Sequence, residues 1–237
     1  MSNFTLLSGW ALAASNLLPL QRALQERLPA LNVKVAELPP DLQMSTLEPN
    51  LSALAEALPA GWLGGWSLGG VLAVQLQRRF PERFLGVVTI ASNACFSARE
   101  GWPEAMAPET FKGFISDARE QPERALKRFG LLVTQGAERA RELSRQLVWS
   151  DLDPLQRLNH LALLGVLDNR VALQRCQQPV LHCLAGADAL VPAGAAQALA
   201  QLNEQAEVCV LPQASHALPL EAPIWLAGEI GDWLERQ

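Results

Sequence analysis

Short apolar runs alternate with longer amphipathic stretches along this chain. The short runs are typical of buried strands, and we expect strands at residues 4–7, 33–38, 62–65, 85–91, 180–185 and 207–211. Between them, stretches such as residues 17–28 and 68–79 repeat apolar residues every three or four positions, which is typical of helices. This alternation predicts an α/β fold, in which helices flank a mostly parallel sheet.

One long segment interrupts the alternation. From residue 99 to residue 169 we find no convincing strand, only helical stretches punctuated by Pro103, Pro108, Pro122, Gly136 and Pro154. Strands resume at residue 180, so we expect this segment to be a helical cap, or lid, inserted between two strands of one sheet. We therefore expect a single structural domain, with a core formed by residues 1–98 and 170–237 and a cap formed by residues 99–169.

Composition narrows the class of protein. The chain has 237 residues, of which 49% are hydrophobic and 18% are charged, enough for one sizeable core. Its net charge of −5 argues against a global attraction to nucleic acid or to an anionic membrane. The first 20 residues lack the positive start of a secretory signal, and no apolar run is long enough to span a membrane. We therefore expect a cytoplasmic protein, with its four cysteines present as buried reduced thiols: Cys95, Cys176, Cys183 and Cys209.

The strongest chemical signal is the sequence Gly65-Trp66-Ser67-Leu68-Gly69, a G-x-S-x-G motif between an expected strand and an expected helix. A serine on such a sharp turn has its hydroxyl exposed, and the flanking glycines let the backbones approach closely. The N-terminus of the following helix supplies N–H groups where negative charge would develop. Ser67 is therefore the candidate nucleophile.

A serine nucleophile needs a base, and an acid that orients the base. His216 lies in a loop after the last expected strand, whereas His182 lies inside a strand as a core histidine and His160 lies in the cap without a partner pattern. Asp188 follows the preceding strand, so it fits the order nucleophile, acid, histidine. Asp168 is the rival acid, although its neighbour Arg170 suggests a cap or an ion pair. We expect a Ser67–His216–Asp188 triad.

An oxyanion hole requires two backbone N–H groups near the nucleophile. One is expected from Leu68, directly after Ser67, and the other from Trp10, in the loop after the first strand where Gly9 allows a turn. The indole of Trp10 would then line the acyl pocket. The alternative is that this tryptophan only plugs the edge of the sheet.

With these residues assembled, the sequence resembles the α/β-hydrolases, and more narrowly the family of pimeloyl-[acyl-carrier protein] methyl ester esterases of biotin synthesis. The resemblance covers most of the chain. It depends most on residues 8–10, on residues 63–70, and on residues 91–103, where Cys-Phe-Ser-Ala-Arg enters the cap. The resemblance implies the α/β-hydrolase fold, no metal or redox cofactor, and a substrate that is a pimeloyl methyl ester borne by acyl-carrier protein. The short stretch before the first expected strand adds the expectation of a shortened N-terminal edge of the sheet.

The resemblance also implies two binding surfaces. The acyl-lining segment of the family corresponds here to Phe129, Gly130, Leu131, Leu132 and Val133, which with Trp10, Ser67, Leu68 and His216 would contact substrate. The carrier-contacting positions correspond to Arg124, Arg128, Arg141 and Arg145. They lie in a segment, residues 124–145, with a net charge of +4, which would attract an acidic carrier. A merely solvated charged face is the alternative.

Two departures from the family pattern stand out. Ser8 occupies the position at which many relatives have histidine, and the chain begins close to the first strand, so the customary leading hairpin is expected to be absent. Two other functional classes remain open: a generic short-chain carboxylesterase with the same triad, and a non-catalytic interaction protein that retains the fold. We expect a monomer.

Overall fold

A six-stranded parallel sheet forms the centre of the computed structural model, which describes residues 2–237. Its strands lie in the order β2-β1-β3-β4-β5-β6, and every neighbouring pair is parallel. The predicted α/β class is therefore correct. The strand bounds are β1 Asn3–Leu7, β2 Asn32–Ala36, β3 Gly61–Trp66, β4 Phe84–Ile90, β5 Val180–Ala185 and β6 Glu207–Leu211.

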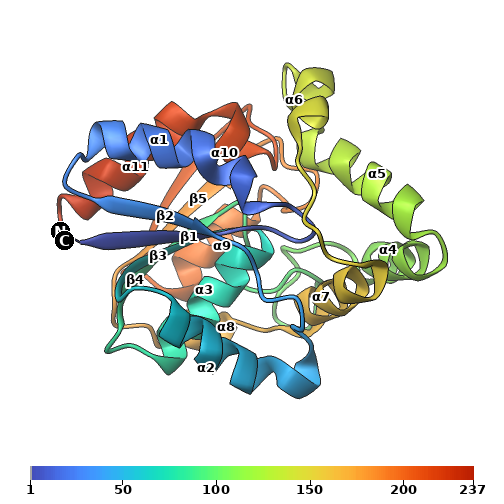
Figure 1. Ribbon diagram of the computed structural model, residues 1–237, viewed down its shortest axis with the longest axis horizontal. Helices are drawn as coiled ribbons and strands as arrows, with labels where there is room; N and C mark the ends of the chain where they lie inside the picture. The colour runs from blue at the N-terminus through green and yellow to red at the C-terminus, as the bar shows by residue number, and fades with distance from the viewer. Residues whose placement is uncertain (1) are drawn as a thin grey trace.

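Helices cover both faces of this sheet (Figure 1). On one face α1 (Leu18–Arg27) packs against α11 (Pro223–Leu234), next to the short α10 (Leu218–Glu221). On the other face α3 (Leu68–Arg79) contacts β1, β3 and β4, and α2 (Leu47–Ala57), α8 (Arg170–Gln174) and α9 (Ala195–Leu202) lie alongside. Two short 3₁₀ helices, η1 (Ala14–Leu17) and η2 (Met44–Thr46), precede α1 and α2.

Four helices lie between β4 and α8, in the segment that the sequence predicts as helical. They are α4 (Pro108–Glu120), α5 (Pro122–Thr134), α6 (Ala140–Gln146) and α7 (Pro154–Val166). Figure 1 shows them grouped to one side of the sheet, beyond the ends of its strands. Proline occupies the first position of α4, α5 and α7, where its missing N–H costs no hydrogen bond.

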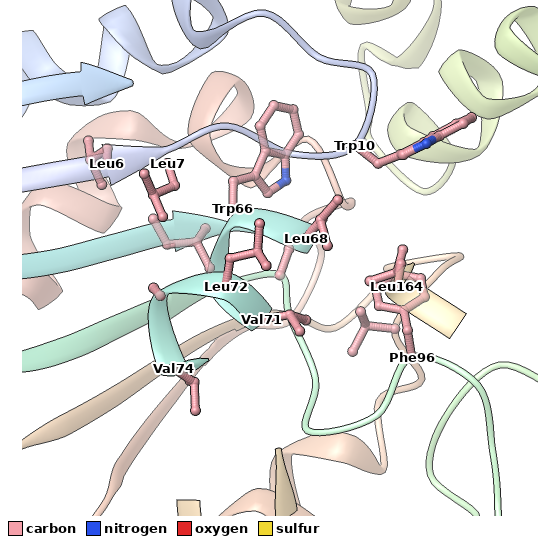
Figure 2. Close-up of a cluster of buried hydrophobic side chains, with 14 of the residues drawn as sticks. Leu6, Leu7, Trp10, Trp66, Leu68, Val71, Leu72, Val74, Phe96 and Leu164 are labelled. Atoms are coloured by element: carbon pink, nitrogen blue, oxygen red, sulfur yellow. The ribbon is translucent and has the colours of Figure 1, made fainter. Parts of the chain in front are cut away.

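The core continues from the sheet into this helical group. Figure 2 shows Trp66, Leu68, Val71 and Leu72 around the turn from β3 to α3, and all four side chains are buried. Aromatic residues of the helical group belong to the same cluster. The two parts therefore share one hydrophobic core.

The four cysteines are all free thiols, with Cys95 and Cys183 buried and Cys176 and Cys209 partly buried. The expectation of buried thiols holds for the first two only. The pKa of the Cys95 thiol is raised to about 12, mainly by burial, so this group is protonated at neutral pH. Among residues 2–237, none of the helices has the length and apolar character needed to cross a membrane.

Candidate active site

Ser67 lies on a sharp turn between β3 and α3. Its backbone has φ of 55° and ψ of −118°, a conformation that residues with a side chain rarely adopt. A Cβ at Gly65 would collide with the backbone of Gly69, and one at Gly69 would collide with the carbonyl oxygens of Leu7 and Ser8. Only glycines allow the strand, the turn and the helix to approach this closely, as the G-x-S-x-G motif predicts.

Asp188 and His216 meet at the same end of the sheet. Asp188 lies in the loop after β5 and His216 in the loop after β6. His216 Nδ1 lies 2.7 Å from Asp188 Oδ2, and both side chains are almost fully buried. The other carboxylate oxygen accepts hydrogen bonds from the amides of Leu190 (2.7 Å) and Val191 (3.0 Å). These contacts hold the carboxylate in place and require that Nδ1 carries a proton.

The remaining imidazole nitrogen of His216 is free. Among residues 2–237, its buried Nε2 has no hydrogen-bond partner. The ring lies near the Ser67 turn: its centroid is 6.1 Å from that of Trp66, the neighbour of Ser67. The indole Nε1 of Trp66 also donates to the carbonyl oxygen of His216 at 2.8 Å. Ser215 anchors the same loop by donating from its hydroxyl (2.6 Å) and its amide (2.8 Å) to Glu221. This nitrogen is therefore the one available to act as a base.

The rival candidates have other partners. Asp168 accepts from Arg170 at 2.7 Å and lies 3.7 Å from Arg99. The pKa of Asp168 is lowered to about 2, mainly by the hydrogen bond from Arg170. His182 is buried within β5, and its Nδ1 pairs with the Thr89 hydroxyl at 2.6 Å, which confirms it as a core histidine. His160 is buried with Nε2 3.0 Å from Pro39 O.

The two predicted oxyanion donors lie on segments next to the Ser67 turn. Leu68 is the first residue of α3, so its N–H has no partner within the helix. Trp10 lies in the loop after β1, and Gly9 of that loop packs closely against the turn. A Cβ at Gly9 would lie 3.3 Å from Trp66 O and 3.5 Å from Ser67 Cβ. The loop that contains Gly9 and Trp10 is thus adjacent to Ser67.

A small apolar cavity adjoins Ser67. Its volume is about 10 Å³. Trp10 packs edge to face on Phe114 (ring centroids 5.3 Å apart) and on Phe129 (4.6 Å), and its indole Nε1 donates to Arg157 O at 2.7 Å. The cavity is lined by Trp10, Ser67, Phe96, Met106, Phe111, Phe114, Phe129, Leu161, Leu164 and Leu190.

The predicted acyl-lining segment is only partly placed at this cavity. Phe129 lines it, Val133 is buried, and Leu132 is partly buried on the core. A Cβ at Gly130 would lie 3.1 Å from the Trp149 ring. None of these last three residues lines the cavity itself. Leu131 is 65% exposed on the outer side of α5 and does not line it either. The helical period explains this separation, because residue 131 falls on the face opposite to residues 129 and 133.

Most of the cavity lining was not identified from the sequence. Phe111 and Phe114 lie three residues apart on an amphipathic helix, and this spacing could have indicated one apolar face of α4. Phe96 and Leu190, by contrast, come from loops on either side of the helical group, and no local pattern relates them. Among residues 2–237, no cluster of three histidine, cysteine or acidic side chains could hold a metal ion.

The four predicted docking arginines are all exposed. Arg124 and Arg128 lie on α5, and Arg141 and Arg145 lie on α6, two helices that contact each other (Figure 1). Arg128 forms an ion pair with Asp117 at 2.8 Å, and Arg124 donates to Gln121 at 3.1 Å. The structure thus gathers the four side chains on neighbouring helices.

Comparison with known proteins identifies the family of this chain. A family model described as the alpha/beta hydrolase family matches residues 6–229. The biotin biosynthesis bifunctional protein BioHC of Cellvibrio japonicus is 39% identical over 241 residues, covering 97% of this chain and 47% of that protein. The chain thus spans about half the length of this relative. The pimeloyl-[acyl-carrier protein] methyl ester esterase of Salmonella paratyphi A is 37% identical over 179 residues, which cover 73% of this chain and 69% of that protein.

The fold is shared more widely than the sequence. A bromoperoxidase from Bacillus anthracis superposes with a TM-score of 0.84 at 17% identity, over 99% of this chain and 92% of that chain. At that identity the likeness shows the fold alone. The family match and the Salmonella relative go further: the chain belongs to the alpha/beta hydrolase family, and within it to the family of the pimeloyl-[acyl-carrier protein] methyl ester esterases.

Proposed function

We propose that this chain is a serine esterase that hydrolyses the methyl ester of a pimeloyl chain carried by acyl-carrier protein. One observation carries the proposal. The free Nε2 of His216, whose other nitrogen is held by Asp188, lies beside the turn that presents Ser67 to an apolar cavity. The names of the relatives from Cellvibrio japonicus and Salmonella paratyphi A supply the substrate and the pathway.

In the first step Ser67 Oγ attacks the ester carbonyl while His216 Nε2 takes its proton. The amides of Trp10 and Leu68 donate to the oxygen that becomes negative, and removal of one such donor typically slows catalysis by about 10²–10³-fold. Asp188 stabilises the charged imidazole and keeps its ring oriented. In this structure no hydrogen bond joins Nε2 to Ser67, and such bonds often tighten only when substrate binds.

In the second step His216 returns its proton to the departing methanol, which leaves an acyl group on Ser67. The same nitrogen then activates a water molecule, which attacks the acyl carbonyl. Collapse of this intermediate regenerates Ser67 and releases the free carboxylate, while the thioester to the carrier stays intact. Each step uses the same three side chains, so the loss of any one should slow turnover by several orders of magnitude.

The helical segment has two roles in this proposal. Residues 99–169 act as the cap over a core of residues 1–98 and 170–237, and their Phe129, Gly130, Leu132 and Val133 surround the acyl chain together with Trp10. The exposed arginines at positions 124, 128, 141 and 145 dock the acidic carrier, because opposite charges accelerate encounter and fix orientation. The free cysteines are compatible with a reducing, cytoplasmic setting, and the monomeric state stays a prediction.

The second candidate is a short-chain carboxylesterase that does not need a carrier. The small volume of the cavity favours it, since little space lies beside Ser67 for a long acyl chain. In this case the arginines of α5 and α6 are only a solvated surface. The two candidates share the catalytic chemistry and differ in substrate.

Growth without biotin separates the two candidates. The chain is expressed in a bacterial strain that lacks its own pimeloyl-carrier methyl ester esterase, with Ser67→Ala as the matched control. The proposal predicts growth with the unaltered chain and none with Ser67→Ala. Hydrolysis of small esters without growth would instead identify a short-chain carboxylesterase.

A further inference from the structure

The loop after β1 contains a strained residue next to the proposed oxyanion donor. Ala11 has φ of 57°, although it is not a glycine. Such a conformation costs energy for a residue with a side chain and persists only where neighbouring groups hold it. It follows Trp10 directly and lies inside a tight turn in which Leu12 N donates to Gly9 O at 3.3 Å. The direction of the Trp10 amide therefore depends on what holds Ala11.

A three-residue strap from the cap holds this loop. The strap, residues 148–150, runs antiparallel to residues 11–13, with a β-bridge between Leu12 and Trp149. Ser150 N donates to Ala11 O at 3.0 Å, and Ala13 N donates to Val148 O at 3.0 Å. Two backbone hydrogen bonds, one on each side of Leu12, thus join this loop to the strap.

Asn16 fixes the strap in turn. Its side chain is only 2% exposed, within the 3₁₀ helix η1. Its Nδ2 donates to Val148 O at 2.7 Å and to Ala13 O at 2.8 Å, and its Oδ1 accepts from Val148 N at 3.0 Å. Both donor hydrogens and the acceptor are used, and the amide binds both polar groups of one strap residue.

The chemistry of these contacts is specific to asparagine. Aspartate would present a second acceptor to the carbonyl oxygens of Val148 and Ala13, where donors are required. Alanine would leave Val148 N without this side-chain partner at a partly buried hydrogen bond, which is costly. The side chain therefore does more than fill space between η1 and the strap.

We infer that Asn16 is a positioning residue for the oxyanion hole: by fixing Val148, it makes the strap hold Ala11 in its left-handed conformation and thereby directs the Trp10 amide at Ser67. This inference rests on the proposed roles of Ser67 and Trp10. Asn16 does not touch substrate. Its influence passes from Val148 to Ala11 and then to the amide of Trp10.

The test compares Asn16→Ala with the unaltered enzyme on a small soluble ester, p-nitrophenyl acetate, with active sites counted by a serine-directed phosphonate. A misdirected hydrogen-bond donor is less harmful than a missing one. We therefore expect kcat per active site to fall about tenfold, a smaller loss than the roughly 10²–10³-fold caused by removing an oxyanion-hole donor completely. KM should stay within about twofold, because the lost interaction belongs to the transition state. An unchanged kcat would overturn the inference.

A second substitution tests the route through Ala11. Glycine adopts a positive φ without strain, so Ala11→Gly in the Asn16→Ala background should restore most of kcat. Failure to restore it would contradict the role of Ala11, because a general loss of packing around η1 is not repaired by glycine. If Asn16→Ala does not yield folded enzyme, Asn16→Asp, which retains the acceptor for Val148 N, takes its place with the same expected loss and rescue.

Two controls make the result specific. Asn203→Ala removes hydrogen bonds to Leu173 O (2.9 Å) and from Gln205 N (3.0 Å) at the end of α9, away from Ser67, and should leave kcat unchanged. Equal loss in this variant would overturn the inference. Ser67→Ala should abolish turnover, and turnover retained there would remove the proposed function itself. The comparison of Asn16→Ala with the unaltered enzyme uses only a small ester. It therefore remains valid even if the enzyme does not hydrolyse a carrier-linked substrate.

Discussion

His216 Nδ1 lies 2.7 Å from Asp188 Oδ2, and the amides of Leu190 and Val191 occupy the other carboxylate oxygen. The carboxylate is therefore fixed on three sides before substrate arrives. Because it can only accept hydrogen bonds, it dictates that the proton of a neutral imidazole lies on Nδ1 and that Nε2 is the basic nitrogen.

Asp188→Asn should lower kcat by about 10³–10⁴-fold, because the amide can stabilise the wrong tautomer of His216. Asp168→Asn is the matched control, since Asp168 pairs with Arg170 and Arg99 instead, and it should retain a kcat near that of the unaltered enzyme. Steady-state kinetics on p-nitrophenyl acetate measure both. A similar loss in the two variants would show that the acid has been misassigned.

Gly69→Ala should remove activity and much of the stability. Its new Cβ would meet the carbonyl oxygens of Leu7 and Ser8, so α3 would have to move away from the loop that carries Gly9 and Trp10. Gly113→Ala, on the exposed side of α4, meets no atom within 4 Å and should raise the free energy of unfolding by about 0.5–1 kcal/mol. Urea unfolding and ester hydrolysis on both variants check the contrast, and a fully active Gly69→Ala would refute the close approach.

Reversing the charges of Arg124 and Arg128 to glutamate should raise KM for the carrier-linked methyl ester and leave hydrolysis of p-nitrophenyl acetate unchanged. Added salt should weaken the carrier reaction in the unaltered enzyme for the same reason, because exposed charges are screened over about 8–10 Å at physiological ionic strength. Arg175→Glu, on an exposed arginine outside α5 and α6, is the matched control. Equal losses on both substrates would count against docking.

The free energy of unfolding should fall as the pH drops below about 6.5. Burial lowers the pKa of His182 to about 4 and also lowers that of His160, so the unfolded chain takes up protons that the folded protein does not. The stabilising contribution is complete above the pKa that histidine has in the unfolded chain. It is lost as the pH falls below that value, and each histidine lowers the free energy of unfolding by up to about 1.4 kcal/mol per pH unit. Urea unfolding between pH 7.5 and 5 should show a smaller slope in His182→Asn, and an identical slope would exclude His182 as a source.

The sequence alone predicted the sheet closely, for a physical reason. A buried parallel strand is an apolar run between loops, and each of the six observed strands overlaps the run expected for it; β5 and β6 have the expected bounds. The sharp turn at Ser67 was equally evident from the sequence, because Gly65, Ser67 and Gly69 must lie close together in the chain for the turn to form. Structural features formed by residues that are close in the chain can be recognised from short sequence patterns.

The contacts that complete the site leave no such pattern. The bonds from Asn16 to Val148 and from Ser150 to Ala11 join residues more than 100 positions apart, and backbone groups take part whatever the side chain is. Leu131 illustrates the opposite failure. The family resemblance implied five lining residues in a row, but the period of α5 turns this one to solvent.

Mass spectrometry of the carrier substrate tests the central claim most directly. Acyl-carrier protein bearing the pimeloyl methyl ester is incubated with the unaltered chain, with Ser67→Ala, and with no enzyme. Hydrolysis by a Ser67 nucleophile predicts that only the unaltered chain lowers the mass by one methylene group, with the pimeloyl thioester retained. The account would be contradicted if Ser67→Ala gave the same product at the same rate, or if the unaltered chain left the methyl ester intact.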